Sequence, residues 1–213
     1  MITALVLAAA LGACADFQAS RQSAECVPMA ANWRATATDD DRRRLRQGRD
    51  AWMEGLGQAQ VRHAGAIAAE GALFDPDAAL PGPLPPAGDY RCRTIKLGSP
   101  SDLLTYVAYP PFRCRIGAEG GRPSFTKLTG SQRPIGRLFD DTERRMVFLG
   151  TLQLGDERRA YQYGIDRDRD LVAVLERIGE NRWRLVFPYP HFESFLDVIE
   201  ITPSADSRQG TIQ

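Results

Sequence analysis

DYRCRTI, residues 89–95, recurs in outline as PFRCRI, residues 111–116. Each copy has an aromatic residue followed by Arg-Cys-Arg. The sequence changes character at this pair, because the apolar residues before it follow a helical period and those after it alternate as they do in strands. This division predicts an α+β protein in which a long N-terminal helix packs on a mostly antiparallel curved sheet or small barrel.

The part of the chain after residue 89 consists of short β-prone runs separated by turn signals. The clearest run places Trp183, Leu185 and Phe187 in alternation with Arg182 and Arg184, which indicates a strand with one face in water. About eight to ten short antiparallel strands at such spacing are typical of a barrel or a strongly curved sheet.

The part before residue 89 is predicted to be mainly helical. Thr38 is a suitable N-cap, and three Asp residues follow it at the positive end of the helix dipole. The helix is expected to reach Glu70, with Gly55 or Gly57 as a possible kink. One face of it carries an apolar stripe that contains Leu45, Trp52, Leu56, Ala59, His63 and Ile67.

Composition predicts a single domain over residues 33–203, divided into a helical part with a proline-rich crossover (33–88) and a β part (89–203). Residues 1–13 resemble a signal peptide, 14–32 a flexible tether and 204–213 a polar disordered tail.

The 27 basic and 27 acidic residues balance, which argues against a nucleic-acid partner. Only two of the basic residues are Lys, a skew toward Arg that is typical of a GC-rich genome.

Leu11-Gly12-Ala13-Cys14 resembles the lipobox of bacterial lipoproteins, in which the cysteine is lipidated and becomes the new N-terminus. A membrane partner would then be reached through this lipid. Ala15 favours sorting to the outer membrane of a Gram-negative bacterium, facing the periplasm. The alternatives are a plain secretory signal cleaved nearby and a chance match.

Three cysteines remain if Cys14 is lipidated. Cys92 and Cys114 share their local context and are the best candidates for a disulfide, which leaves Cys26 unpaired. Such a bridge would contribute about 3 kcal/mol through the unfolded state. It requires the two Cys strands to be neighbours, with residues 98–111 as an excursion, because a strand between them would separate the cysteines too far. The alternative is three unrelated thiols.

Strand alternation places the arginines of the repeated motif on the face opposite the cysteines. If the cysteines lie directly opposite each other, Arg91 faces Arg115 and Arg93 faces Arg113, and such like-charged pairs are destabilising. Either carboxylates such as Asp89 offset them, or the four arginines form a patch for an anionic partner. An acidic protein, a lipid headgroup or a polysaccharide would suit such a patch.

Motifs for catalysis, nucleotide binding and metal binding are missing from the sequence, so no cofactor or metal is expected. Residues 166–170 begin like a calcium loop, but Leu171 stands where the loop needs Gly and Arg177 where it needs Glu. His63 is interpreted as a packing residue. His191 lies in a loop and is the more accessible of the two histidines, so it is the candidate for any catalytic role.

Several segments resemble an uncharacterised family of exported alphaproteobacterial proteins, domain of unknown function 4893, over about residues 33–203. They include PPAGDYRCR (85–93), GSQRP (130–134), VFLG (147–150), ERIG (176–179), RWRLV (182–186) and LDVIE (196–200). The resemblance supports the domain limits and implies no activity. Because catalytic motifs are missing, the leading hypothesis is a non-enzymatic cell-envelope binding or interaction protein. The alternatives are a lipocalin-like carrier of a small amphiphile and a hydrolase that uses His191.

Overall fold

The computed structural model describes residues 32–204, so the predictions on the signal peptide, Cys14, Cys26 and the C-terminal tail lie outside the described residues. The helical elements are α1 (Trp33–Thr36), α2 (Asp39–Arg46), α3 (Gly48–Glu70) and the 3-10 helix η1 (Gly71–Phe74). The strands are β1 (Gly88–Leu97), β2 (Tyr106–Ala108), β3 (Phe112–Glu119), β4 (Arg122–Lys127), β5 (Gln132–Thr142), β6 (Arg145–Leu154), β7 (Asp170–Gly179), β8 (Arg182–Pro188) and β9 (Leu196–Pro203).

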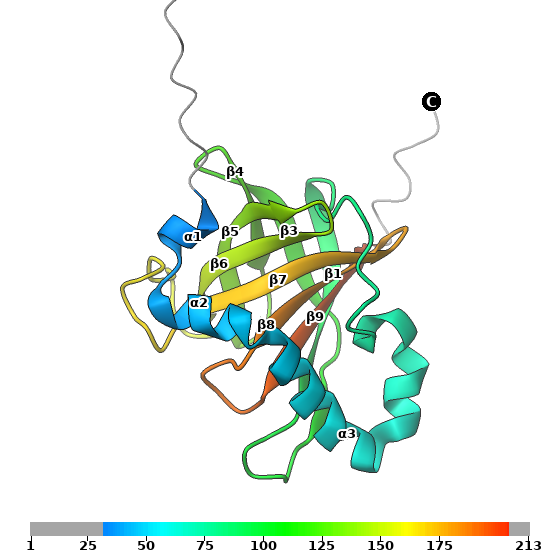
Figure 1. Cartoon of the computed structure of the whole chain (residues 1–213). Helices are drawn as coiled ribbons and strands as arrows, with labels where there is room; N and C mark the ends of the chain where they lie inside the picture. Colours follow the sequence, from blue (N-terminus) through cyan, green and yellow to red (C-terminus); the bar gives the residue numbers. More distant parts are fainter. Residues whose placement is uncertain (1–31, 205–213) are drawn as a thin grey trace, which may run out of the picture. The chain divides into compact units, whose positions relative to one another are not determined.

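Eight of the strands close into an antiparallel barrel. Strands β3 to β9 pair in sequence order, and β1 joins the two ends because it pairs with β3 on one side and with β9 on the other. The short β2 pairs with the second half of β1, on the same edge of β1 that pairs with β3 in its first half. Figure 1 shows the strands curving around a common axis, with α2 and α3 on the outside. Of the two predicted alternatives, a curved sheet and a small barrel, the structure has the barrel.

The helix predicted from Thr38 to Glu70 is divided in the structure. Thr38 caps α2 as expected, since its hydroxyl accepts a hydrogen bond from the amide of Asp41. The first division lies at Gln47, between α2 and α3, and the second at His63, whose φ of −129° is not helical. Gly55 and Gly57 do not break α3. His63 stacks on Tyr106 with ring centroids 5.2 Å apart, in agreement with its interpretation as a packing residue.

Three apolar clusters hold these elements together. The barrel interior is filled by side chains that include Phe125, Phe148 and Trp183, all at most 4% exposed. The second cluster lies between α3 with η1 and the outer faces of β1, β8 and β9. The third lies between α1 and the outer faces of β5, β6 and β7. Burial of these faces stabilises the fold by about 25 cal/mol for each Å² of apolar surface removed from water.

Cys92 and Cys114 form a disulfide between β1 and β3, with Cα atoms 5.9 Å apart. The Cys strands are neighbours and residues 98–111 are an excursion, as the geometric argument required. The cysteines do not lie directly opposite each other, however, so the pairing of Arg91 with Arg115 that depended on this register does not occur. Tyr90 faces Cys114 and Cys92 faces Phe112, so the bridge runs diagonally and Arg91 faces Arg113.

Candidate functional site

The four arginines of the repeated motif do not act as one group. Arg93 faces Glu200 of β9, not Arg113, and its guanidinium lies 2.6 Å from a Glu70 oxygen and 2.8 Å from a Glu200 oxygen. These hydrogen bonds, the Glu70 one above all, raise the pKa of Arg93. Arg115 faces Asp89, and their nearest N and O atoms are 2.6 Å apart. Carboxylates therefore offset two of the four charges.

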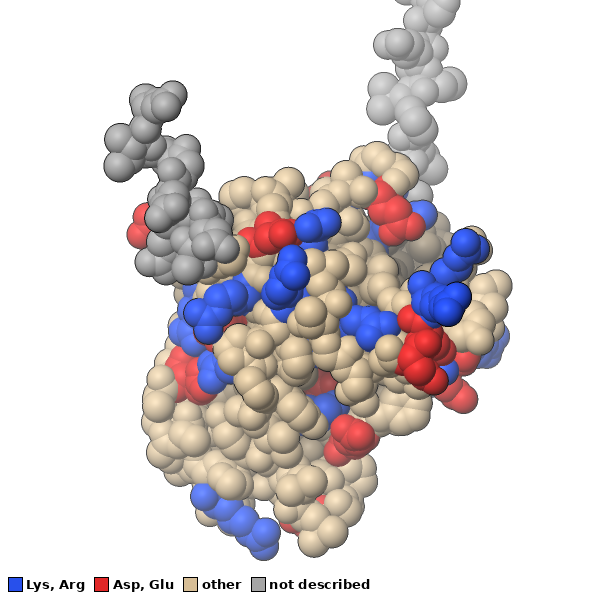
Figure 2. All heavy atoms as spheres, turned by 180° about the vertical axis from the view of Figure 1, so that it is seen from behind, with Lys and Arg blue, Asp and Glu red and all other residues tan. Residues whose placement is uncertain are grey.

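Arg91 and Arg113 lie directly opposite each other and are exposed. Neither forms an ion pair with a carboxylate among residues 32–204. Figure 2 shows that basic and acidic side chains are interspersed over this view of the molecule, without a continuous basic surface. The part of the predicted patch that could still attract an anion is this pair of arginines.

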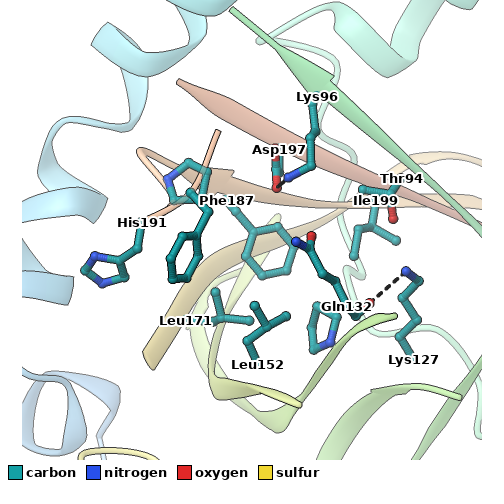
Figure 3. A pocket seen from close by; sticks show the side chains of 13 residues that line it. Thr94, Lys96, Lys127, Gln132, Leu152, Leu171, Phe187, His191, Asp197 and Ile199 are labelled. Atoms are coloured by element: carbon teal, nitrogen blue, oxygen red, sulfur yellow. Dashed lines mark hydrogen bonds and ion pairs between the residues drawn. The ribbon is translucent and has the colours of Figure 1, made fainter. Parts of the chain in front are cut away.

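A small chamber with a mostly apolar lining and a few polar side chains lies inside one end of the barrel, with a volume of about 50 Å³. All the barrel strands except β3 contribute side chains to it, and the β8–β9 loop (189–195) contributes the rest (Figure 3). Its lining consists of Thr94, Lys96, Lys127, Gln132, Pro134, Leu152, Leu171, Phe187, Pro190, His191, Phe192, Asp197 and Ile199. The volume suits a few water molecules or a ligand of a few heavy atoms.

The two lysines of the chain both point into this chamber. Lys96 is 5% exposed and Lys127 is 4% exposed, whereas lysine is seldom fully buried unless it is paired. Strand alternation explains their direction, because Lys96 lies on the same face of β1 as Cys92 and Lys127 lies on the same face of β4 as Phe125. The sequence analysis did not identify either lysine as a site residue.

Lys96 is paired with a carboxylate. Its Nζ lies 2.9 Å from Asp197 Oδ2 and 3.4 Å from Glu193 Oε2. Burial lowers the pKa of Lys96, but the two carboxylates outweigh burial and raise it above its ordinary value. Burial also raises the pKa of Asp197. Wherever the shared proton resides, Lys96 and Asp197 together carry no net charge.

Lys127 lacks such a partner. Its Nζ donates a hydrogen bond to the backbone carbonyl of Gln132 at 2.8 Å and lies 3.8 Å from the centre of the Phe112 ring. No carboxylate in residues 32–204 forms an ion pair with it. Burial, followed by repulsion from Lys96, lowers the pKa of Lys127 to about 8. The protonated form therefore places in the chamber a positive charge that has no carboxylate in direct contact, although Asp197 attracts it from a distance.

One further polar group of the chamber, the hydroxyl of Thr94, could form a hydrogen bond with a ligand. The hydroxyl of Thr94 is buried and has no hydrogen-bond partner in the described part of the chain. A buried hydroxyl without a partner costs about 1–3 kcal/mol. A ligand or water in the chamber that bonds to Thr94 would remove this cost.

The β8–β9 loop covers the chamber and contains two strained residues. Tyr189 has φ of 43° and Glu193 has φ of 73°, both in the left-handed region that non-glycine residues rarely adopt. The loop is held by the Glu193–Lys96 ion pair and by a hydrogen bond from Ser194 Oγ to Asp197. Such strain is found preferentially at ligand clamps and active sites.

His191 lies in this loop and lines the chamber. Its Nε2 is 4.0 Å from Asp40 Oδ2 of α2, and burial lowers its pKa, with a further contribution from Arg44. The imidazole is therefore neutral at pH 7. Among residues 32–204 it has no hydrogen bond to a hydroxyl or thiol that could serve as a nucleophile.

The fold and site define a small closed antiparallel barrel with a chamber under one end into which two lysines point. The chain belongs to the family described as domain of unknown function DUF4893, whose model matches residues 33–201. No curated protein and no solved structure matches the chain. Within residues 32–204, no helix is long and apolar enough to cross a membrane, and no group of three or more potential ligands could hold a metal ion.

Proposed function

We propose that the protein is an exported cell-envelope protein, anchored by a lipid on Cys14, that binds a small anion in the chamber of its barrel. The observation that carries the binding role is Lys127, a buried lysine without a carboxylate partner. A buried charge normally has a counter-charge, because its desolvation is costly. A small anion beside Lys127 would supply that counter-charge and could also bond to the Thr94 hydroxyl.

The alternative of a lipocalin-like carrier of a small amphiphile is less well supported. Lipocalin-like carriers enclose their ligands in an open barrel, whereas Phe148 and Trp183 fill the interior here and leave about 50 Å³. Tyr161 does not take part in this filling, since it is half exposed. The ligand that fits is therefore small.

A hydrolase that uses His191 is the second candidate, because a neutral imidazole that lines the chamber can act as a general base. The binding function is preferred because a hydrolase of this kind also needs a nucleophile beside the imidazole. Esterase and phosphatase assays of the wild type and of His191→Ala distinguish the two functions. Turnover that disappears in the variant would favour the hydrolase.

We expect wild-type protein to bind acetate or formate and Lys127→Met to lose this binding, as measured by isothermal titration calorimetry at pH 7. The affinity should fall as the pH rises above about 8, because the unliganded lysine then loses its proton and an anion must restore it. Well above that pKa, each further pH unit should weaken binding up to about tenfold.

Arg91→Met is the matched control, since it removes one positive charge from the exposed outer face and leaves the chamber intact. Unchanged acetate binding in Lys127→Met would contradict the proposed site. Loss of binding in Arg91→Met alone would instead favour the outer arginine pair.

The anchor has a separate test. Full-length protein produced in a Gram-negative host is expected to lose residues 1–13 and to carry acyl chains on Cys14, which intact-mass spectrometry detects. Cys14→Ser should abolish the acylation and release the protein from the membrane fraction. A mature wild-type protein without acyl chains would refute the anchor and leave the proposed chamber untouched.

A further inference from the structure

We propose that Lys127 also reacts covalently, by forming an imine with the carbonyl group of a small 2-oxo acid held in the chamber. This inference rests on the proposed small-ligand site and adds a class of ligand and a chemical step to it. It is carried by the different surroundings of the only two lysines in the sequence.

The surroundings of Lys127 lower the pKa of its amino group, so that a reactive unprotonated fraction exists near pH 7. The residue is 96% shielded from solvent, and the hydrogen-bond acceptor of its amino group is a neutral carbonyl. The face of the Phe112 ring, 3.8 Å from Nζ, attracts the protonated form and partly offsets this effect. The Lys96 ammonium contributes repulsion. Desolvation next to a second cation is an established way to activate a lysine as a nucleophile. With a pKa of about 8, roughly one Lys127 in ten is unprotonated at pH 7.

The surroundings of Lys96 have the opposite effect. Its ion pairs with Asp197 and Glu193 retain the proton, so Lys96 is a poor nucleophile although it lines the same chamber. Its role would be electrostatic: an ammonium has three N–H donors, of which two have carboxylate partners. The third donor is available to a ligand carboxylate.

These groups together select a 2-oxo acid. Figure 3 shows the two lysines reaching the chamber from different strands, and in that view Thr94 and Gln132 lie between their ends. A carboxylate can accept hydrogen bonds from Lys96 and Thr94 while the adjacent carbonyl carbon meets Lys127. The volume of about 50 Å³ favours the shortest members of the class. Glyoxylate is the smallest of them and is the probe used below.

The reaction balances without an oxidant or reductant. The amine of Lys127 attacks the carbonyl carbon, a C–N bond forms, and one amine proton moves to the carbonyl oxygen to give a carbinolamine. The C–O bond then breaks, and the oxygen leaves as water with that proton and the second amine proton. Asp197 and His191 are the titratable groups of the chamber, besides the lysines, that can carry these protons. Outside the chamber, Glu193 pairs with Lys96, Arg133 repels Lys127, and Asp40 and Arg44 lie near His191.

The test is reductive trapping of the full-length protein in detergent at pH 7 with glyoxylate and cyanoborohydride, followed by intact-mass and peptide mapping. The reduced adduct is expected at Lys127 and not at Lys96, and its rate of formation should rise as the pH approaches 8. Because the chain has only two lysines, each site is read on a separate peptide. Prior incubation with acetate should slow the labelling, since both ligands would occupy the chamber.

Two variants control for trivial explanations. Lys127→Arg keeps the positive charge and cannot form the adduct, and circular dichroism checks that it is folded. Arg91→Lys places an ordinary exposed amine on the outer face, and Lys127 should label at least tenfold faster than this residue. Labelling of Lys127 at the rate of the surface lysine, or of Lys96 to the same extent, would overturn the inference. If acetate still binds in that case, the proposed function stands; if acetate does not bind either, both fail.

Discussion

Arg184→Met is expected to lower the free energy of unfolding by about 3–5 kcal/mol, the cost of removing one partner of a buried ion pair. Arg184 is fully buried outside the barrel wall. Its Nε donates to Glu176 at 2.7 Å, and its Nη1 donates to the backbone carbonyls of Ala72, Leu73 and Asp75 at 2.8–3.1 Å. The guanidinium therefore attaches η1 to β8, and methionine would leave the carboxylate and the carbonyls without donors.

Urea denaturation of purified protein measures this effect. Arg144→Met is the matched control, since Arg144 is paired with Glu143 on the exposed surface, and such pairs contribute about 0–1 kcal/mol. The double variant Arg184→Met with Glu176→Gln should recover part of the loss, because it no longer buries an unpaired carboxylate. A loss at Arg184 no greater than that at Arg144 would show that this guanidinium does not hold η1 to the barrel.

The strands and the disulfide could be predicted from local patterns, but the closure of the barrel could not. Alternation and turn residues reveal where a strand runs, whereas the pairing of β1 with β9 joins segments about 100 residues apart. The register of β1 on β3 was missed for a related reason. A disulfide tolerates a range of Cα separations, so the cysteine positions alone allow both a direct and a diagonal bridge.

The divided helix illustrates how tertiary packing overrides a local pattern. The apolar stripe fits one continuous helix. In the structure, α2 adjoins β7, whereas α3 covers β1, β8 and β9 on another side of the curved wall. A straight helix cannot follow that wall, and the breaks at Gln47 and His63 allow the chain to do so.

The candidate site was predicted only in its outer part. The arginine motif led to the exposed pair Arg91 and Arg113, but the chamber was missed because the excess of Arg over Lys was attributed to genome composition. The sequence did hold a usable signal: the alternation that places Cys92 inward also places Lys96 inward. Its meeting with Lys127 and Asp197 depends on barrel closure and could not be derived from one strand.

Gly150→Ala is expected to lower the free energy of unfolding by about 3 kcal/mol, the upper part of the range for an overpacked core. Gly150 of β6 faces Gly136 of β5 inside the barrel wall, and the Phe148 ring packs across both. An added Cβ would lie 2.3 Å from the carbonyl oxygen of Ile135 and 2.5 Å from Phe148 Cζ, so either the strand pair or the ring must move. A similar clash predicts that Gly136→Ala also lowers the free energy of unfolding.

Gly57→Ala is the control, and it is expected to change the free energy of unfolding in the opposite direction. Gly57 lies within α3, is exposed, and has no heavy atom within 4 Å of the position of an added Cβ. Alanine there should raise the free energy of unfolding by about 0.5–1 kcal/mol, because it restricts the unfolded chain and favours the helix. Urea denaturation of both variants distinguishes a steric clash at Gly150 from a general effect of replacing glycine by alanine. If Gly150→Ala is tolerated as well as Gly57→Ala, the close approach of β5 and β6 is not what requires glycine.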